Sequence, residues 1–198
     1  MPSEYDPKIH RRHSIRLPGY NYSQEGWYFI TICTQKHLCL FGEIAEDRMR
    51  LSDAGLMIDL WWRKLIGKFL HVQLDGYVIM PNHFHGIIYV GAALCGRPDN
   101  QREKLYKSNK IAYNRQGQSH GIAPTIGDIV NWFKTMTTNQ YIRGVKINRW
   151  KPFPGRLWQR NYYEHIIRDE KELNHFRQYI SDNPINWKID EENPDILP

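Results

Sequence analysis

Two histidines on alternate positions of one short stretch are the residues of this sequence best suited to chemistry. The stretch runs Met80-Pro-Asn-His-Phe-His-Gly-Ile-Ile-Tyr-Val90. Its Pro81-Asn82 pair predicts a turn, and the apolar residues that follow predict a strand. Successive side chains on a strand point to opposite faces, so His83 and His85 share a face that Phe84 does not. Two such imidazoles can hold one divalent ion and leave its other positions open, although two unrelated histidines at a strand end would show the same spacing.

A tyrosine and an asparagine far along the sequence could complete such a site. Tyr179 and Asn183 lie four residues apart in a segment with helical periodicity, so one falls above the other beside the apolar stripe. A phenol can act as a nucleophile, and an amide oxygen can bind a metal ion. The spacing alone favours an ordinary edge residue of an amphipathic helix, and the catalytic interpretation requires a metal ion beside the tyrosine.

The segments that must position these residues alternate between strand and helix patterns. Strands are expected where β-branched and aromatic residues cluster, in ranges 27–34, 76–80, 83–90 and 157–167, with a small hairpin over 39–44 and 49–51. Helices are expected where apolar residues recur at helical spacing, in ranges 52–69, 125–143 and 169–183. The last residues, 193–198, are expected to form a short loose end.

This order of elements predicts an α+β fold. We expect a ferredoxin-like or RRM-like sandwich, with a central antiparallel sheet that carries the His-x-His strand and helices packed on it. The whole chain, 1–198, is expected to be a single domain with a basic N-terminal arm over 1–18. Residues 91–124 are rich in Gly, Pro, Asn, Gln, Ser and Lys, which predicts a flexible surface insertion.

The charge balance favours a phosphate-rich partner. The chain of 198 residues has 27 Lys and Arg against 21 Asp and Glu, a formal net charge of +6. The basic residues that we expect to contact nucleic acid are Arg11, Arg12 and Arg16 of the arm, Lys134, and Arg160. We expect no membrane partner, because no apolar run approaches the roughly 20 residues of a membrane span.

The sequence also predicts where the protein works. The first residues lack the apolar core of a secretory signal. The three cysteines are odd in number and have no CxxC spacing, which is typical of reduced thiols. We therefore expect a cytoplasmic protein.

Several stretches together resemble a known family. They are Pro18-Gly-Tyr-Asn-Tyr-Ser, Phe29-Ile-Thr-Ile-Cys-Thr34, Leu40-Phe-Gly-Glu-Ile44, Met80-Pro-Asn-His-Phe-His-Gly-Ile-Ile88 and the helix of Tyr179–Asn183. From about residue 10 to residue 187, interrupted by 91–124, the chain resembles the single-tyrosine HUH transposases, and most of all their REP-associated branch, the RAYTs. The Met-Pro-Asn-His-x-His-Gly segment is the specific part of the match.

The resemblance implies roles for four residues. His83 and His85 match the imidazole ligands of a divalent ion, Mg²⁺ or Mn²⁺, and Asn183 matches the amide that completes the ligand set. Tyr179 matches the nucleophile. The implied activity is metal-dependent nicking and joining of single-stranded or hairpin DNA through a 5′-phosphotyrosine intermediate, by a monomer or a homodimer.

Two other interpretations stay open. The chain could be a domesticated protein that binds DNA hairpins without cleaving them. It could also be a metal-dependent phosphodiesterase that uses water, in which Tyr179 is structural.

Overall fold

A four-stranded antiparallel sheet lies at the centre of the protein, seen in a computed structural model that describes residues 25–69, 71–91 and 124–196. Across the sheet, the strands are β4 (Val72–Ile79), β5 (His83–Val90), β1 (Gly26–Cys33) and β6 (Tyr163–Ile167). The helices are α1 (Asp53–Arg63), α2 (Leu65–Lys68), α4 (Ile126–Asn148) and α5 (Glu170–Asp182), with 3₁₀ turns η1 (Gln35–His37) and η2 (Trp187–Ile189). A separate hairpin of β2 (Gly42–Ala45) and β3 (Arg48–Leu51) precedes α1.

The connections between strands form two split β-α-β units. β1 leads through α1 and α2 to β4, with β5 between the two strands, and β5 leads through α4 to β6, with β1 between them. All neighbouring strands of the sheet are antiparallel. This is the ferredoxin-like arrangement, so the predicted α+β fold with the His-x-His strand in its central sheet is confirmed.

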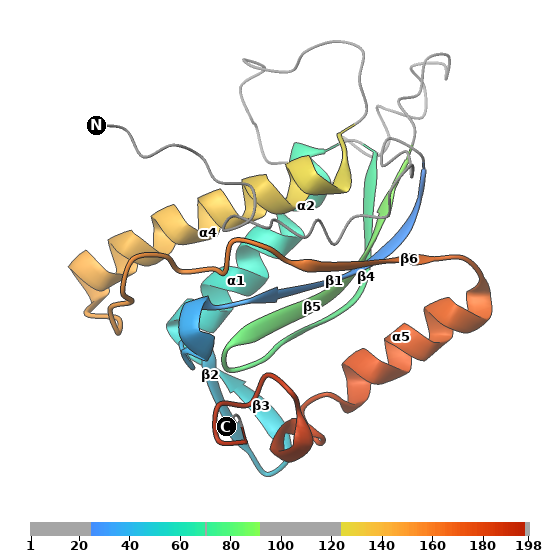
Figure 1. Cartoon of the computed structure of the whole chain (residues 1–198). Helices are drawn as coiled ribbons and strands as arrows, with labels where there is room; N and C mark the ends of the chain where they lie inside the picture. Colours follow the sequence, from blue (N-terminus) through green and yellow to red (C-terminus); the bar gives the residue numbers. More distant parts are fainter. Residues whose placement is uncertain (1–24, 70, 92–123, 197–198) are drawn as a thin grey trace, which may run out of the picture.

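Helices cover both faces of the sheet (Figure 1). On one face, α1 and α4 enclose a large apolar core that includes Phe84. On the other face, α5 packs against a smaller core that includes Phe29 and Ile87. The alternation of side chains along β5 therefore places His83 and His85 on the α5 face.

Position 86 requires glycine because of the packing on the α1 side of β5. A Cβ at this position would lie 2.7 Å from Cε1 of Phe84 and 2.7 Å from Cζ2 of Trp62. Both aromatic residues are fully buried, and their ring centroids are 4.6 Å apart. The aromatic rings occupy the space that a side chain at position 86 would need, so β5 lies close against α1.

The ends of several elements differ from those that the sequence predicted. β4 begins at Val72 instead of residue 76, because a register shift between Leu74 and Tyr77 lets the strand continue through an irregular step. The helix expected over 52–69 is divided at Lys64 into α1 and α2. β6 is confined to 163–167, whereas a strand was expected from residue 157.

The second long helix is longer than expected. α4 continues past Gly144 to Asn148, instead of ending near Arg143, and stops where Arg149 adopts a left-handed conformation with φ of 58°. The ring of Trp150 folds back onto Gly144, in the space that a Cβ there would occupy. Glycine at position 144 thus serves packing and does not end the helix.

Two predicted segments lie largely outside the described residues. The basic arm 1–18 lies wholly outside them. Of the insertion 91–124, only residues 91 and 124 are described. The sequence also predicted a loose end over 193–198. Up to Ile196 the structure differs from this prediction, because Asn193 is buried and its Nδ2 donates a hydrogen bond to the backbone oxygen of Trp187 at 2.9 Å. Within the described ranges, no helix is long and apolar enough to cross a membrane.

An ion pair ties α5 to β4. Nε of Arg177 donates to Oδ1 of Asp75 at 3.0 Å, and its Nη2 donates to Oδ2 at 2.7 Å. The Arg177 hydrogen bonds lower the pKa of the Asp75 carboxyl group below its ordinary value. Because bidentate pairing fixes orientation as well as distance, this contact helps to set the position of α5 and of Tyr179 on it.

We predict that Asp75→Asn lowers the free energy of unfolding by about 1 kcal/mol near pH 7. The folded pKa of Asp75 lies below the unfolded value near 3.8, so the ion pair stabilises the protein above that value. Its contribution is lost as the pH falls through the folded pKa. Urea unfolding of both proteins at neutral and at acidic pH should show the difference shrink, and Glu43→Gln, at an exposed position on β2, is the control. An equal difference at both pH values contradicts the prediction.

Candidate metal and tyrosine site

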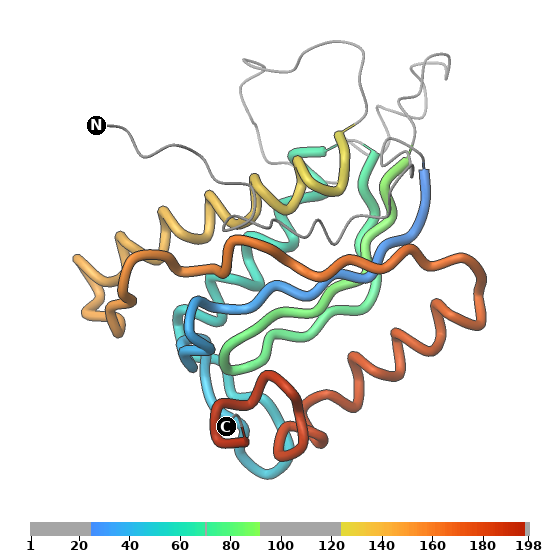
Figure 2. The backbone as a smooth tube through the Cα atoms, in the orientation of Figure 1, coloured from blue at the N-terminus to red at the C-terminus, as the bar shows by residue number. Residues whose placement is uncertain are grey.

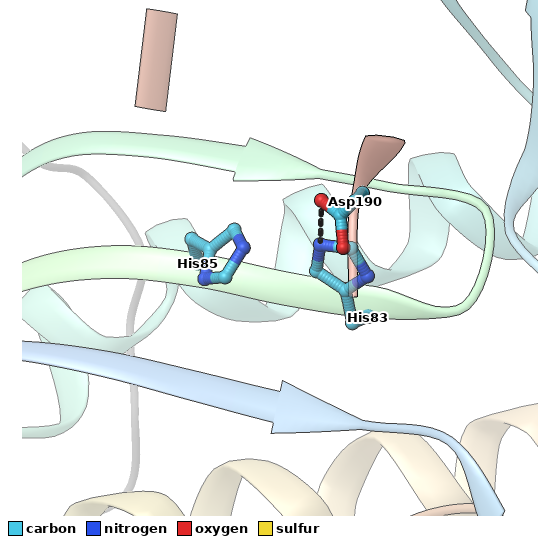
Figure 3. Close-up of side chains that lie close together, drawn as sticks. All are labelled: His83, His85 and Asp190. Atoms are coloured by element: carbon cyan, nitrogen blue, oxygen red, sulfur yellow. Dashed lines mark ion pairs between the residues drawn. The ribbon is translucent and has the colours of Figure 1, made fainter. Parts of the chain in front are cut away.

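The imidazole rings of His83 and His85 lie side by side on the α5 face of β5 (Figure 3). Their ring centroids are 4.5 Å apart. Both side chains are buried, and Phe84 between them points to the opposite core. The alternation expected from the sequence thus brings the two imidazoles together.

An amide side chain sets the tautomer of His83. Nδ2 of Asn82 donates to the backbone oxygens of His37 at 3.2 Å and Glu192 at 2.6 Å, so its Oδ1 is the atom turned toward His83. This Oδ1 lies 2.8 Å from Nδ1 of His83. An amide oxygen only accepts hydrogen bonds, so Nδ1 carries the proton and Nε2 keeps its lone pair. In this tautomer, Nε2 of His83 could bind a metal ion.

His85 is held in a similar way by the neighbouring strand. Its Nδ1 lies 2.8 Å from Oγ1 of Thr31, the residue that faces it on β1. Burial lowers the pKa of both His83 and His85. Neutral imidazoles are the form that binds metal ions, so the buried pair suits this role.

Asp190 reaches the histidine pair from the C-terminal segment, just after η2 (Figure 3). Its Oδ2 lies 3.9 Å from Nε2 of His83, and its side chain is 7% exposed. One ligand atom from each of His83, His85 and Asp190 lies within 4.8 Å of the others. The three residues could hold a metal ion, and two imidazoles with a carboxylate suit a first-row divalent ion such as Mn²⁺.

The phenol of Tyr179 lies over His85. Its oxygen is 3.5 Å from Nε2 of His85, and the two ring centroids are 5.2 Å apart. The residue is 42% exposed, so a substrate can reach it. Burial of the hydroxyl group raises the pKa of Tyr179, and the Asp190 carboxylate raises it further. The phenol thus keeps its proton near neutral pH and must be activated to act as a nucleophile.

Asn183 lies one helical turn beyond Tyr179 and is buried. Its amide neighbours both His83 and Tyr179. Its Oδ1 and the Nε2 of His83 are buried atoms without a hydrogen bond to any described residue. Leaving such an atom unpaired costs about 1–3 kcal/mol, and a cation between them would satisfy both lone pairs. The residues present therefore fit a divalent ion, with oxygen ligands available from Asp190 and Asn183.

Lys134 is placed differently from the phosphate-binding position that the sequence predicted. Its Nζ donates to the backbone oxygens of Gln159 at 2.8 Å, Arg160 at 3.2 Å and Asn161 at 3.3 Å. An ammonium group has three N–H donors, so these bonds use all of them. Burial lowers the pKa of Lys134 to about 8. Lys134 is thus a structural clamp, whereas the Arg160 side chain is exposed and stays a candidate for DNA contact.

The other predicted nucleic-acid residues, Arg11, Arg12 and Arg16, lie outside the described residues. The four residues proposed for chemistry, His83, His85, Tyr179 and Asn183, are brought together from β5 and α5.

Cys33 and Cys39 form no disulfide among the described residues.

Comparison with known proteins shows a relative that matches almost the whole chain. A protein of Haemophilus influenzae described as uncharacterized is 41% identical over 193 residues, which cover 96% of this chain and 98% of that protein. The two chains belong to one family. No family model matches the sequence.

The solved structures that are similar to this chain include two transposases or proposed transposases. One is a REP-associated tyrosine transposase bound to a REP hairpin, 16% identical, covering 86% of this chain and 73% of its own, with a TM-score of 0.47. The other is a proposed transposase from Deinococcus radiodurans, 15% identical, covering 84% of this chain and 95% of its own, with a TM-score of 0.42. Both scores are below 0.5, so the fold assignment rests on the strand order of this chain itself.

Reasoning from the sequence missed three residues of the site. Thr31 and Asn82 orient the histidines through their outer nitrogens, and Asp190 adds a carboxylate. The signal for Asp190 was an acidic run, Asp190-Glu-Glu192, in an otherwise basic chain. The turn signal Pro81-Asn82 was recognised, but its role for the His83 tautomer needs the distant backbone partners of Asn82.

We predict that Mn²⁺ binds the protein and raises its thermal unfolding midpoint, because an ion that binds only the folded state stabilises it. His83→Ala should abolish this shift. Loss of a residue that only orients a ligand typically lowers metal affinity roughly 10- to 100-fold. Asp190→Asn should lower the Mn²⁺ affinity by at least this factor. Isothermal titration calorimetry measures the affinity.

The matched control for Asp190 is Glu191→Gln, which removes one negative charge from the adjacent, exposed position. It should leave the Mn²⁺ affinity within about twofold, as expected for a screened surface charge. Equal losses in the two variants would show a general charge effect and would remove Asp190 from the ligand set. In that outcome Asn183 remains as the oxygen ligand.

Proposed function

We propose that this chain is a metal-dependent enzyme that nicks and joins single-stranded DNA, of the single-tyrosine HUH transposase type and its REP-associated branch. The observation that supports this most is the distance of 3.5 Å between the Tyr179 oxygen and Nε2 of His85, two residues 94 positions apart in the sequence. Attack on a phosphodiester requires a nucleophile beside a group that holds positive charge against the phosphate oxygens. With a divalent ion on His83 and His85, the site would meet this requirement.

In the proposed reaction, the phenolic oxygen of Tyr179 attacks the scissile phosphorus in line with the 3′ oxygen. The Tyr179 O–P bond forms while the P–O3′ bond breaks, and the proton of the phenol is lost as the departing 3′ oxygen gains one to become a 3′-OH. The phosphate remains a diester that joins Tyr179 to the 5′ end. A 3′-OH from another strand can attack this diester and release Tyr179, so joining needs no external energy source.

The residues of the chain divide this work among them. His83 and His85 would hold a divalent ion, Mg²⁺ or Mn²⁺, with oxygen from Asp190 or Asn183. When bound, the ion would supply charge stabilisation for the non-bridging phosphate oxygens. The outer nitrogens of both histidines are already engaged, so the rings need little reorganisation before they bind it.

A run of exposed positive charge precedes β6 and is suited to a DNA backbone. Between Asp128 and Glu164 the sequence contains no acidic residue. All basic residues of this segment except Lys134 are exposed: Arg143, Lys146, Arg149, Lys151, Arg156 and Arg160. After α4, the chain runs back past the end of β1 before it becomes β6 (Figure 2). The basic segment thus leads to the edge of the sheet beside the site, where it could contact phosphates.

We predict a covalent protein–DNA adduct when a labelled single-stranded hairpin oligonucleotide is incubated with the protein and Mn²⁺ or Mg²⁺. The adduct should be absent in Tyr179→Phe, because that variant lacks the attacking oxygen. Tyr89→Phe is the control, since it removes a phenolic oxygen at the other end of β5, where Tyr89 is paired with Trp27. A denaturing gel separates adduct, cleaved strand and intact strand.

The same gel distinguishes the alternatives. Binding without cleavage in the wild-type protein would indicate a DNA-binding protein that does not cut. Cleavage without an adduct, unchanged in Tyr179→Phe, would indicate hydrolysis by water. His83→Ala and His85→Ala should abolish cleavage and leave most DNA binding, because the histidines act on the phosphate and not on the bulk of the strand.

We also predict that binding falls steeply as salt rises, because cations released from DNA drive the association. The double variant Arg143→Gln/Lys146→Gln should reduce the slope of log K against log[salt] by up to about 0.7–0.9 for each phosphate that the variant no longer neutralises. Fluorescence anisotropy at several salt concentrations measures this slope. Lys171→Gln, on α5 among acidic neighbours, is the control and should leave the slope unchanged.

A further inference from the structure

The exposed residue Tyr163 lies level with His85 across the sheet, with one strand between them. On the α5 face, Thr31 of β1 is paired with His85 of β5 on one side and with Tyr163 of β6 on the other. Neighbouring strands lie about 4.8 Å apart, so the backbone of Tyr163 is roughly 10 Å from that of His85. Tyr163 is 52% exposed, although it is large and aromatic.

The ring of Phe29 connects Tyr163 with the reacting groups. Its centroid is 6.4 Å from that of Tyr163, 5.8 Å from that of Tyr179 and 5.4 Å from that of His85. Phe29 meets both tyrosine rings edge-on. It is itself only 3% exposed, so it supports the ring of Tyr163 from within while much of that side chain remains open to solvent.

The sheet edge next to Tyr163 is bulged. Thr31 pairs with Tyr163, and Thr34 forms a bridge with Trp158. Thr31 and Thr34 are three residues apart at the end of β1, whereas their partners Tyr163 and Trp158 are five residues apart. The segment that faces β1 therefore contains two extra residues. Both Arg160 and Asn161, within this bulge, have exposed side chains.

Lys134 holds the bulge in place from the α4 side. Its three N–H donors bind the consecutive backbone oxygens of residues 159–161, so these carbonyl groups turn toward α4. Burying an ammonium group carries a desolvation cost that these hydrogen bonds offset, and the arrangement keeps the bulge in one conformation. Bulges at sheet edges often re-aim side chains beside an active site.

We propose that Tyr163 and Arg160 form a subsite for the unpaired nucleotide next to the scissile phosphate. The base stacks on the exposed ring of Tyr163, and the guanidinium group of Arg160 pairs with a backbone phosphate. Stacking on an aromatic side chain accepts any base, whereas hydrogen bonding to base edges would select one. This proposal rests on the proposed function, because it requires that the site receives a single strand of DNA.

The subsite implies a path for the DNA strand across the sheet. The strand passes from Tyr179 and the histidine pair across Thr31 to β6, at right angles to the strands of the sheet. β6 is the edge strand, so the nucleic acid can leave the site there without meeting another strand. The exposed basic residues of the segment that precedes β6 could contact the strand beyond this point.

The test uses the full-length protein without metal and single-stranded oligonucleotides that carry one 2-aminopurine, moved along the strand position by position. Stacking on an aromatic ring quenches the fluorescence of this base. Quenching beyond that of the free strand should occur at one position for the wild-type protein and persist in Tyr163→Phe. It should be lost in Tyr163→Ala and Tyr163→Leu, with affinity weakened roughly 5- to 150-fold.

The variants Tyr163→Leu and Arg160→Gln make the result specific. Tyr163→Leu keeps apolar packing on Phe29, so a loss of quenching in a protein that still unfolds near the wild-type temperature is not a folding defect. Arg160→Gln should weaken binding and flatten its salt dependence while the quenching stays. Quenching that persists in both Tyr163→Ala and Tyr163→Leu, or that occurs at no position, would overturn the subsite.

Failure of the subsite and failure of the proposed function give different results. If the wild-type protein forms the Tyr179 adduct but Tyr163→Ala binds and quenches like wild type, only the subsite is wrong, and the bulge merely protects the sheet edge. If the wild-type protein binds no single-stranded oligonucleotide, both proposals are wrong.

Discussion

The packing of α5 against one phenylalanine is the contact on which the site depends. Phe29, on β1, stacks on Phe176 of α5 with ring centroids 4.3 Å apart, and on His85 of β5 at 5.4 Å. Tyr179 and Tyr163 meet the same ring edge-on. One buried side chain thus contacts His85 on β5, Tyr163 on β6, and both Phe176 and Tyr179 on α5. Apolar packing of this kind is rigid, as the proposed role of Tyr179 beside a metal ion would require.

A second layer of contacts prepares the histidines before any ion or substrate arrives. Asn82 joins three parts of the chain, since its amide binds the backbone of His37 and Glu192 and the ring of His83. The C-terminal segment that includes Asp190 is therefore anchored by the same turn that orients His83. The position of this segment and the orientation of the His83 ring are physically linked through one amide side chain.

The parts of the site that local periodicity determines could be predicted from the sequence. Alternation along a strand placed His83 and His85 on one face, and helical spacing placed Tyr179 beside Asn183. The fold followed from the order of elements. Asp190 could not be found in this way, because its position depends on a hydrogen bond between residues 110 apart. The bulge before β6 was missed for the same reason, since the half-buried ammonium group that binds its carbonyl oxygens comes from α4.

Gly86 follows the second histidine, yet its constraint comes from the opposite side of the sheet. Trp62 and Phe84 fill the volume above it, and no Cβ fits there. Positions 62, 84 and 86 should therefore be coupled: a larger residue at 86 can be accepted only if the rings of both Trp62 and Phe84 give way. Relatives that keep both histidines but have lost this glycine should show compensating changes at these two positions, on the side of the sheet that faces away from the histidines.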